Sequence, residues 1–393
     1  MNEGNLAPER LVDPQVHADG TADEIWRWLR AHQPVHYHLA GEYPAFWSVT
    51  RYDDARRIYA SPALFSSACG VLLRPVAVGE DPGAGLTLAL TDPPRHRALR
   101  RMLAPGFSQG CARTLAVQMR HDVRTVLSEA AEAAEFDFAH AVAGRLSSLL
   151  IARLIGVPEH DFNQVVRWVE EAFAVARPMT SHTFLTGYVI DLMNERLVEP
   201  RRDAISSLAD GEVDGELLTE TEILLNCENL LGASENAGLS MAAGMAALLA
   251  YPDQWQDLAE HDEIMPQAVE EILRFGSSAT HSMRTATTDT VVGHRKIAAG
   301  ERVVVWVRSA NYDESQFTAP RRFDLRRQAN RHLALGFGEH VCIGQVMARH
   351  QLRILLSEML SSVQSFEQVG EVRPLRSIAV NGPARLPMRI NLR

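Results

Sequence analysis

Long segments with a helical repeat of hydrophobic and polar positions fill the middle of the chain. Apolar residues recur there every three to four positions, which places them on one face of an α-helix. Short polar joints separate the segments. The pattern predicts long helices over residues 94–103, 109–133, 137–155, 159–175, 183–208 and 219–250, shorter ones over 253–260 and 263–275, and a last long helix over 344–362.

Strand-like alternation is found towards the two ends of the chain. VHYHLA and AFWSVT alternate near the N-terminus, and strand-like runs ending in ERVVVWVRSA and PMRINL follow in the C-terminal half. No internal repeat is visible. We therefore predict a single, mainly α-helical domain over residues 1–393. Its β-rich parts are expected near 30–50, near 280–310 and at the C-terminus, and its helical parts over 93–275 and 344–362.

Composition narrows the range of partners. The chain has 393 residues, 46% of them hydrophobic, and a formal net charge of -10. An acidic protein lacks the positive field that gathers phosphates, so we expect no nucleic acid partner. The four cysteines lie far apart and form no CxxC pair. This spacing argues against disulfides or a zinc site and fits a reducing cytoplasm.

Neither the N-terminus nor the long helices predict a membrane segment. The polar start MNEGNLAPERLVDPQ lacks the basic and apolar blocks of a signal peptide. The stretch from Asn236 to Tyr251 carries no charge, but it contains Asn, Gly and Ser and follows Glu228 and Glu235 closely. A buried core helix fits it better than a membrane span. We expect a cytoplasmic monomer without membrane attachment.

One cysteine stands in a setting that suggests metal ligation. Gly336, Gly338 and Gly344 surround Cys342, which directly precedes the last long helix. Glycines let the backbone turn sharply and approach a flat ligand without an intervening Cβ atom. Unpaired amides and the positive end of the following helix would lower the pKa of a thiol at this place. The alternative is that Cys342 is a buried small hydrophobic residue, the usual role of a lone cysteine.

The whole pattern favours metal ligation. Written as G-x-G-x-H-x-C-x-G, residues 336–344 resemble the haem-binding loop of the cytochrome P450 superfamily. The resemblance implies a P450-like helical prism with small β regions that binds haem b, with Cys342 as ligand of the iron. It also implies haem contacts from Gly336, Phe337, His340 and Gly344. Leu335 replaces the family's phenylalanine, and we expect this change to shift the haem potential without affecting ligation.

Two further motifs match the same family. Glu271 and Arg274 lie three positions apart, where an ordinary surface ion pair would stabilise little. The family carries E-x-x-R here and pairs it with an arginine after an F-D dipeptide, which corresponds to Arg327. We expect these three side chains to form a structural clamp. The side chains that match the family's propionate-binding positions are His96, Arg100, Arg284 and His332.

The helix predicted over 219–250 contains GASENAG, where the family usually shows an acid followed by threonine at a helix distortion that makes room for dioxygen. Glu235 keeps the acid, whereas Asn236 replaces the threonine. A buried acid is costly unless it is paired or has a task, so Glu235 is a candidate proton-relay residue. Asn236 can hydrogen-bond an oxygen ligand but cannot act as a hydroxyl relay. This leaves open substrate-assisted proton delivery, a reordered water chain or a different reaction.

The remaining features concern partners and substrate. Positive charge gathers near the expected propionate and cysteine helices at Arg95, Arg97, Arg101, Arg349 and Arg353. Such a cluster is usually only solvated surface, but the resemblance implies a docking face for an acidic ferredoxin. Substrate specificity is expected from the loops at 71–90, 175–186 and 278–282. His281 is either a polar contact for the substrate or a solvent-facing turn residue.

Together the matches run from His96 to Arg353 in the family's order. They imply a monooxygenase that inserts one oxygen atom from dioxygen into a small organic substrate, free or bound to a carrier protein, in a biosynthetic tailoring step. The electrons would come through ferredoxin and ferredoxin reductase. Two alternatives remain. One is a haem-thiolate peroxygenase or oxidative coupling enzyme, which Asn236 favours, and the other is a non-catalytic haem-binding sensor.

Overall fold

Helices make up most of the computed structural model, which describes residues 6–173 and 179–393. The helices are α1 (Pro14–Ala18), α2 (Thr21–His32), α3 (Tyr52–Tyr59), α4 (Arg95–Leu103), α5 (Gln109–Glu132), α6 (Arg145–Ile155), α7 (Phe162–Phe173), α8 (Met179–Val198), α9 (Ala204–Ala209), α10 (Glu220–Ala250), α11 (Pro252–Glu260), α12 (Met265–Gly276), α13 (Val307–Asn311) and α14 (Gln345–Ser362). The predicted fold class, mainly α with small β regions, is confirmed.

The strands are short and form small sheets. They are β1 (Val35–His38), β2 (Phe46–Val49), β3 (Phe65–Ser66), β4 (Phe136–Asp137), β5 (Glu212–Val213), β6 (Glu216–Leu217), β7 (His281–Ala286), β8 (Thr290–Val292), β9 (Arg295–Ile297), β10 (Arg302–Trp306), β11 (Val363–Gln368), β12 (Arg373–Pro374), β13 (Pro383–Arg385) and β14 (Pro387–Leu392). The largest sheet has the order β1-β2-β10-β7-β3, with β2 and β10 parallel and the other neighbours antiparallel.

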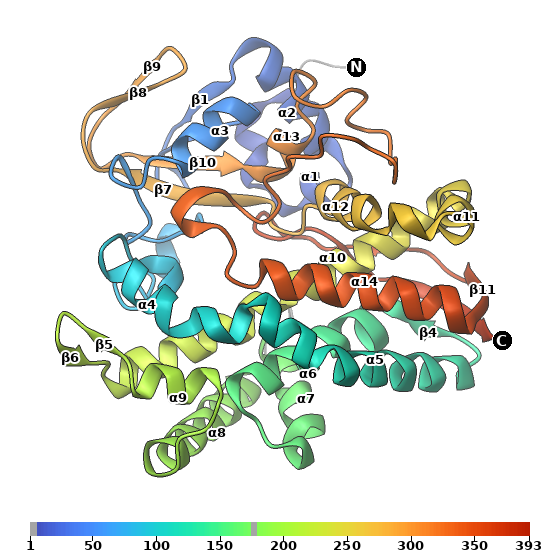
Figure 1. The fold of residues 1–393 in the computed structure, drawn as a ribbon. Coiled ribbons are helices and arrows are strands. Elements are labelled where there is room, and N and C mark those ends of the chain that lie inside the picture. The colour runs from blue at the N-terminus through green and yellow to red at the C-terminus, as the bar shows by residue number, and fades with distance from the viewer. Residues whose placement is uncertain (1–5, 174–178) are drawn as a thin grey trace.

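Both faces of the central strand β10 are covered. Val303 packs in one cluster with Ile58 of α3, whereas Val304 packs in another with Leu29 of α2. Successive side chains of a strand point to opposite faces, so a strand buried on both sides needs a continuous apolar run. This explains the sequence VVVW in β10. Figure 1 shows the sheet with α2, α3 and α13 at one end of the molecule and the helical part at the other.

The helical part departs from the predicted elements at two joints. The helix predicted over 183–208 is divided into α8 and α9, because Pro200 has no backbone N–H and disfavours helical conformation in the residue before it. The helix predicted over 137–155 begins instead with a π-helical segment, η6 (Ala139–Gly144), which continues into α6. Both η6 and α6 pack against α10.

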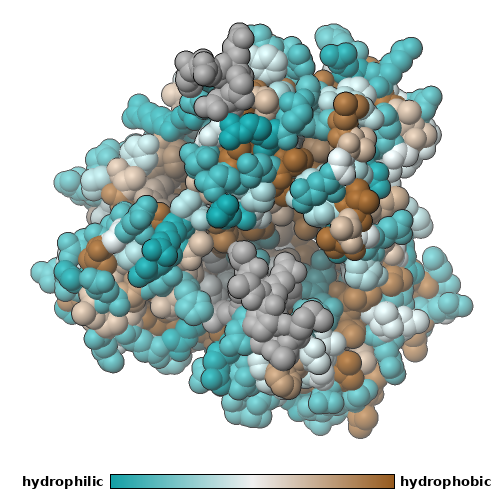
Figure 2. Space-filling model, turned by 180° about the vertical axis from the view of Figure 1, so that it is seen from behind, coloured by the Kyte–Doolittle hydropathy of each residue, from teal (hydrophilic) through white to brown (hydrophobic). Residues whose placement is uncertain are grey.

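α10 is the buried centre of the helical part. A capping box of Thr219 and Glu222 fixes its start, and Met241, Met245 and Leu248 are among its buried side chains. The uncharged stretch after Asn236 is therefore a core helix, as predicted. Within residues 6–173 and 179–393, no helix combines the length and the apolar content needed to span a bilayer. Hydrophilic side chains cover most of the face drawn in Figure 2, with small apolar groups between them.

Candidate functional site

The glycine-rich segment before α14 forms a tight loop that presents Cys342. Gly336 and Gly338 both have a φ of 73°, a left-handed conformation that glycine adopts without steric cost. The Cys342 amide donates a hydrogen bond of 2.8 Å to the Leu335 carbonyl oxygen, which closes the loop. A methyl group at Gly338 would lie 2.6 Å from the carbonyl oxygen of Tyr59. The loop therefore packs directly against the end of α3.

The Cys342 thiol has a different environment from the expected one. Burial raises the pKa of this thiol, while the Gly344 amide and the charges of Arg100 and Arg349 act in the opposite direction. Burial has the larger effect, so the pKa of Cys342 is raised overall. The prediction that the helix end lowers it is wrong. A metal ion that binds here has to displace the thiol proton.

Cys342 lies in the wall of a cavity of about 360 Å³, a size typical of sites for small molecules and cofactors. Its walls come from α6, α10, the segment between α12 and β7, the cysteine loop and the start of α14. Apolar side chains predominate, among them Phe107, Leu150, Leu154, Leu230, Leu273 and Met347. The predicted substrate loops contribute Val71 and Ala89 from 71–90 and Ser278, Ala279 and Ser282 from 278–282. Of the predicted 175–186 loop, residues 175–178 lie outside the described residues. The prediction is wrong for the remainder, because α8 (Met179–Val198) begins there.

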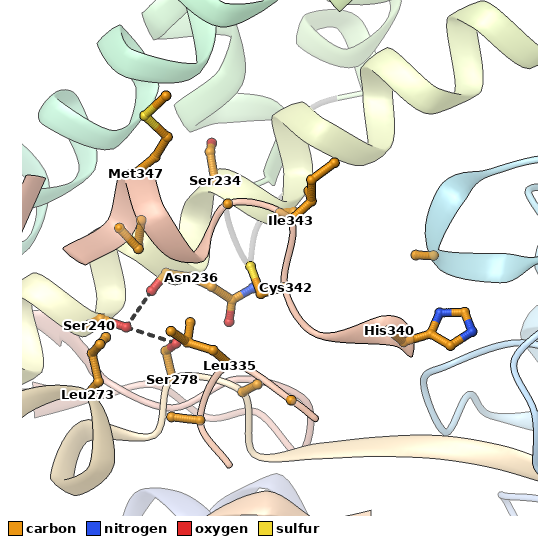
Figure 3. A pocket seen from close by; sticks show the side chains of 18 of the residues that line it. Ser234, Asn236, Ser240, Leu273, Ser278, Leu335, His340, Cys342, Ile343 and Met347 are labelled. Carbon is orange, nitrogen blue, oxygen red and sulfur yellow. Dashed lines mark hydrogen bonds between the residues drawn. The ribbon is translucent and has the colours of Figure 1, made fainter. Parts of the chain in front are cut away.

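Most of the predicted site residues meet at this cavity. The lining includes Asn236, Arg284, Gly336, Phe337, His340, Cys342 and Gly344. The predicted residues outside the lining are His96, Arg100, Glu235 and His332. In Figure 3, Asn236 and Cys342 face the same space. Ser240 hydrogen-bonds the Asn236 carbonyl oxygen at 2.8 Å and the Ser278 hydroxyl at 3.0 Å.

The acid and the amide of α10 lie at two different cavities. Asn236 lines the Cys342 cavity, and its Oδ1 atom is buried without a hydrogen-bond partner in the described part of the chain. Glu235 lines a second cavity of about 260 Å³, together with His140 and Ser148. The predicted distortion is also not in α10, which is helical from Glu220 to Ala250. The irregular π-helical turns belong to η6, which faces α10.

Positive charge collects beside the cysteine loop. Arg284 is buried, donates one hydrogen bond of 2.7 Å to the Met283 carbonyl oxygen and lies over the ring of Tyr59. Burial lowers the pKa of Arg284 and of the half-buried Arg100. Within the part of the chain that the structure describes, neither guanidinium has a carboxylate at ion-pair distance.

Two histidines lie against this cationic group. The rings of His96 and His340 are 3.9 Å apart between centroids. His96 is buried and contacts the carbonyl oxygens of Leu88 at 2.8 Å and Glu339 at 3.1 Å. Burial, with the charges of His96 and nearby arginines, lowers the pKa of His340 to about 3. His340 is therefore neutral at physiological pH and has one N–H to donate.

Comparison with known proteins relates this arrangement to one family. A family profile described as Cytochrome P450 matches residues 187–378. The chain is 32% identical to cytochrome P450 NovI of Streptomyces niveus over 97% of this chain and 96% of that protein. It is 30% identical to the steroid C26-monooxygenase of Mycolicibacterium smegmatis over 96% and 95%. Its fold matches the crystal structure of P450 OxyD, which is involved in the biosynthesis of vancomycin-type antibiotics, with a TM-score of 0.91, 29% identity and coverages of 98% and 99%. The chain belongs to the cytochrome P450 family.

P450 enzymes are haem-thiolate monooxygenases, and the residues around the cavity fit a haem group. Cys342 offers a sulfur ligand in the cavity wall. Gly336 and Gly338 have no Cβ atoms, so the backbone of the loop can approach a flat ligand closely. Arg284 and Arg100 are cations that lack acidic partners among the described residues, so both are available to bind the carboxylates of haem propionates. The unpartnered Oδ1 of Asn236 marks a polar point on an otherwise apolar wall.

The predicted clamp of Glu271, Arg274 and Arg327 is confirmed. Arg274 binds Glu271 through two hydrogen bonds of 2.8 Å, and both side chains are fully buried. Arg327 reaches the same carboxylate at 3.0 Å, as does the amide nitrogen of Asn330. Other Arg327 nitrogens bind backbone carbonyl oxygens of the irregular segment after α13. The clamp thus fixes the chain that leads into the cysteine loop.

His332 is placed differently from the prediction. Its Nε2 atom lies 3.1 Å from Glu270, which also binds Arg349 at 2.6 Å, and it is not among the lining residues of the Cys342 cavity. Burial alone would raise the pKa of Glu270, but the hydrogen bonds from His332 and Arg349 lower it to about 2. The ring is therefore committed to tying the loop to α12. We leave His332 out of the proposed propionate set.

Neither alternative considered for His281 is correct. The ring is buried and lies outside the lining of the Cys342 cavity. Its Nδ1 atom contacts the Ile378 carbonyl oxygen at 2.8 Å, and its Nε2 atom accepts a hydrogen bond of 2.9 Å from the Leu73 amide. His281 joins the 71–90 loop to the C-terminal segment. It is a structural residue behind the cavity wall.

The arginine cluster is only partly free to bind a partner. Arg95 pairs with Glu222, Arg97 with Glu339 and Arg349 with Glu270. Arg101 on α4 and Arg353 on α14 are exposed and have no ion pair within the described chain. The predicted docking face is therefore reduced to these two residues.

Some cavity residues could not be found from the motifs. The Tyr59 hydroxyl lies 2.7 Å from the Ser282 hydroxyl, and both side chains line the cavity. Ser147 of α6 and Gln351 of α14 do so as well. Ser234 could have been predicted from the sequence, because this serine stands two positions before Asn236 in a motif that lacks the usual threonine.

Proposed function

We propose that this P450 monooxygenase uses haem b to insert one oxygen atom from dioxygen into a small, uncharged organic molecule. The observation that carries the proposal is the position of Cys342. It is a cysteine in a glycine-turned loop, in the wall of a mainly apolar cavity beside two cations that have no acidic partner within residues 6–173 and 179–393. When bound, a haem with a thiolate ligand supplies the activation of dioxygen, because the thiolate favours cleavage of the O–O bond.

The protein's own groups bind, orient and exclude water. Arg284, Arg100 and His340 would hold the two propionates through charge-assisted and neutral hydrogen bonds. His96 would join them by giving up its 3.1 Å contact with the Glu339 carbonyl oxygen. The Leu335 carbonyl oxygen accepts a hydrogen bond from the Cys342 amide, which holds the backbone that carries the sulfur in place. Apolar side chains of α6 and α10 keep the reacting space dry, which strengthens each polar contact inside it. Asn236, in the wall of the Cys342 cavity, would hydrogen-bond dioxygen, and Glu235, which lines the second cavity, would supply protons from there.

The cavity composition supports an uncharged substrate. Small side chains such as Ala233, Ala237 and Ala279 leave room beside α10, and hydroxyl groups such as Ser240 and Ser278 offer hydrogen bonds. A biosynthetic tailoring reaction is supported by the fold match with OxyD, a protein involved in antibiotic biosynthesis. A substrate attached to a carrier protein by a flexible tether would contact the same lining residues of the cavity. The substrate assay therefore includes free and carrier-linked forms.

We further propose ferredoxin and its reductase as electron donors in the cytoplasm. Arg101 and Arg353 supply exposed positive charge without acidic neighbours at ion-pair distance in the described chain, in a protein of net charge -10. An acidic redox protein would be steered to this face.

The deciding experiment is a reduced-CO difference spectrum of purified, haem-supplemented protein. Wild type should show the thiolate-type Soret band. The Cys342→Ala and Cys342→Ser variants should lose it, while Cys111→Ala, which changes a half-buried cysteine on α5, should keep it. A colourless wild-type protein, or a thiolate-type band that survives in both Cys342 variants, contradicts the proposal. Substrates are then found by the spin-state shift that they cause.

A peroxygenase or coupling activity is the second candidate, because Asn236 supplies no hydroxyl at the position where the family has one. It predicts product formation with hydrogen peroxide in the absence of NADH and ferredoxin. Turnover that requires the electron-transfer proteins supports the monooxygenase instead.

A further inference from the structure

Two cavities meet across α10 at a pair of serines. The Cys342 cavity and the second cavity, which contains Glu235 and which we call the back cavity, share two lining residues, Ser147 of α6 and Ser234 of α10. Both shared residues carry a hydroxyl group. Polar continuity between Glu235 and the reacting space therefore runs through these two side chains.

The back cavity has the chemistry of a water-filled chamber. Its polar lining comprises His140, Ser147, Ser148, Ser234 and Glu235, and its volume is about 260 Å³. A buried water needs room and two to four polar partners, and both conditions are met here.

Local packing holds the Ser147 hydroxyl directly against α10. A methyl group at Gly238 would lie 3.0 Å from the Ser147 Oγ atom and 3.2 Å from the Ala143 carbonyl oxygen. The lack of a side chain at Gly238 is what allows η6 and the start of α6 to approach α10 this closely. The π-helical turns of η6 end at Gly144, three residues before Ser147, and so help to set its position.

Both hydroxyls are free to accept a hydrogen bond from water. Ser147 donates its hydrogen to the Gly144 carbonyl oxygen at 2.8 Å, and Ser234 donates to the Leu231 carbonyl oxygen at 2.6 Å. The oxygen lone pairs remain available to the cavities. Turning either hydroxyl away from its own helix gives up a single hydrogen bond, whose net contribution to stability is small. Each serine can therefore take a proton from one side and release its own to the other.

Monooxygenation needs such a route. The overall reaction, R–H + O2 + 2 e⁻ + 2 H⁺ → R–OH + H2O, consumes two protons in each turnover, while the redox partner supplies the electrons. Asn236, which lines the Cys342 cavity, has no hydroxyl to pass a proton on. Glu235 lies on the back-cavity side.

We propose that the back cavity is a hydrated proton reservoir and that Ser147 and Ser234 pass protons from it to the Cys342 cavity, in place of the hydroxyl absent at position 236. The inference rests on the proposed monooxygenase function. It assigns a role to two residues outside the haem-binding motifs. The Glu235 carboxyl group and waters in the back cavity reload the serines from behind α10.

The test uses the Ser147→Ala/Ser234→Ala double variant in the haem-loaded protein. Its matched control is Ser148→Ala, which removes a buried hydroxyl that lines the back cavity but not the Cys342 cavity. Dioxygen alone serves as the probe, with NADH, ferredoxin and its reductase. Without R–H the reaction is O2 + 2 e⁻ + 2 H⁺ → H2O2, which also consumes two protons. NADH consumption and its ratio in H2O and D2O are measured. A reduced-CO spectrum of each variant shows separately whether the haem-thiolate centre, and with it the proposed function, is intact.

The double variant should consume NADH roughly a hundredfold more slowly, at the low end of the range for losing a proton-transfer group, and with a larger solvent isotope effect. Ser148→Ala should stay within about twofold of wild type, and Ser234→Thr, which retains a hydroxyl, should behave like wild type. Crystals of the wild-type protein should show ordered waters that bridge Glu235 and the two serines. Wild-type rates in the double variant, an equal defect in Ser148→Ala, or a back cavity without ordered water would each overturn the proposal.

Discussion

The packing of the cysteine loop against α3 gives the sharpest stability prediction. Gly338 combines a φ of 73° with a backbone neighbour, since a methyl group there would lie 2.6 Å from the Tyr59 carbonyl oxygen. Gly300, in the turn before β10, has a φ of 84° but no atom within 4 Å of such a methyl group. The Gly300→Ala variant therefore measures left-handed strain alone, which costs about 1–2 kcal/mol. Gly338→Ala measures the same strain plus a clash.

The clash can be given a size. An ordinary contact of this kind is about 3.3 Å, so the loop would have to move by roughly 0.7 Å or α3 would have to shift with it. Overpacking of this kind costs about 1–3 kcal/mol, which gives about 2–5 kcal/mol in total for Gly338→Ala. Urea unfolding of the haem-loaded protein measures both variants, and the pyridine haemochrome method measures their haem content. Equal losses of unfolding free energy in the two variants, with full haem content in both, would refute the packing argument.

Three further predictions follow from the described contacts. Glu271→Gln should lower the free energy of unfolding by about 3–5 kcal/mol, because it leaves the buried Arg274 without a counter-charge. Urea unfolding measures this loss. As a control, Glu263→Gln, which changes an exposed carboxylate, should alter the free energy of unfolding by less than about 0.5 kcal/mol. Burial lowers the pKa of His281 to about 4 and that of His38 to about 3, so the unfolded chain binds more protons below the ordinary histidine pKa. Stability should therefore fall as the pH drops below about 6.5 and continue to fall to about 4, and His281→Gln should flatten this slope in urea titrations at several pH values; a stability independent of pH between 7 and 5 would contradict it. Arg353→Glu combined with Arg101→Glu should slow reduction by ferredoxin at least severalfold at low ionic strength and weaken its salt dependence in stopped-flow measurements. Arg202→Glu, which changes an exposed arginine between α8 and α9, should have a smaller effect.

Features set by local sequence could be predicted from the chain alone. α10 and α14 bury long apolar faces, so the period of their hydrophobic residues marks their bounds closely. The cysteine loop was predictable because the positive φ angles at Gly336 and Gly338 are a property of glycine itself. The break at Pro200 is equally local, because a proline inside a helical pattern ends the helix near the preceding residue.

Features set by packing between distant segments could not be predicted. Glu235 and Asn236 are neighbours in sequence, but the cavity that each one meets depends on how η6 and α6 lie against α10. His332 and Glu270 are 62 positions apart, and only the approach of α12 to the cysteine loop brings them within 3.1 Å. The pKa of Cys342 was misjudged for the same reason. The helix end is visible in the sequence, whereas the extent of burial around the sulfur depends on the whole fold.

The arginines show why a cofactor belongs to the folded site. In a chain with 49 acidic residues, the arginines near the cysteine loop that face solvent mostly find acidic partners, as Arg97 does with Glu339 and Arg349 with Glu270. Arg284 and Arg100 are more buried than Arg97, and yet no carboxylate of the described chain reaches either of them. A buried charge without a partner is unfavourable by several kcal/mol. We propose that two carboxylates arriving with a haem group would satisfy both charges at once, that of Arg284 in the cavity wall and that of Arg100 beside it, so that an anion from outside the chain would complete the site around Cys342.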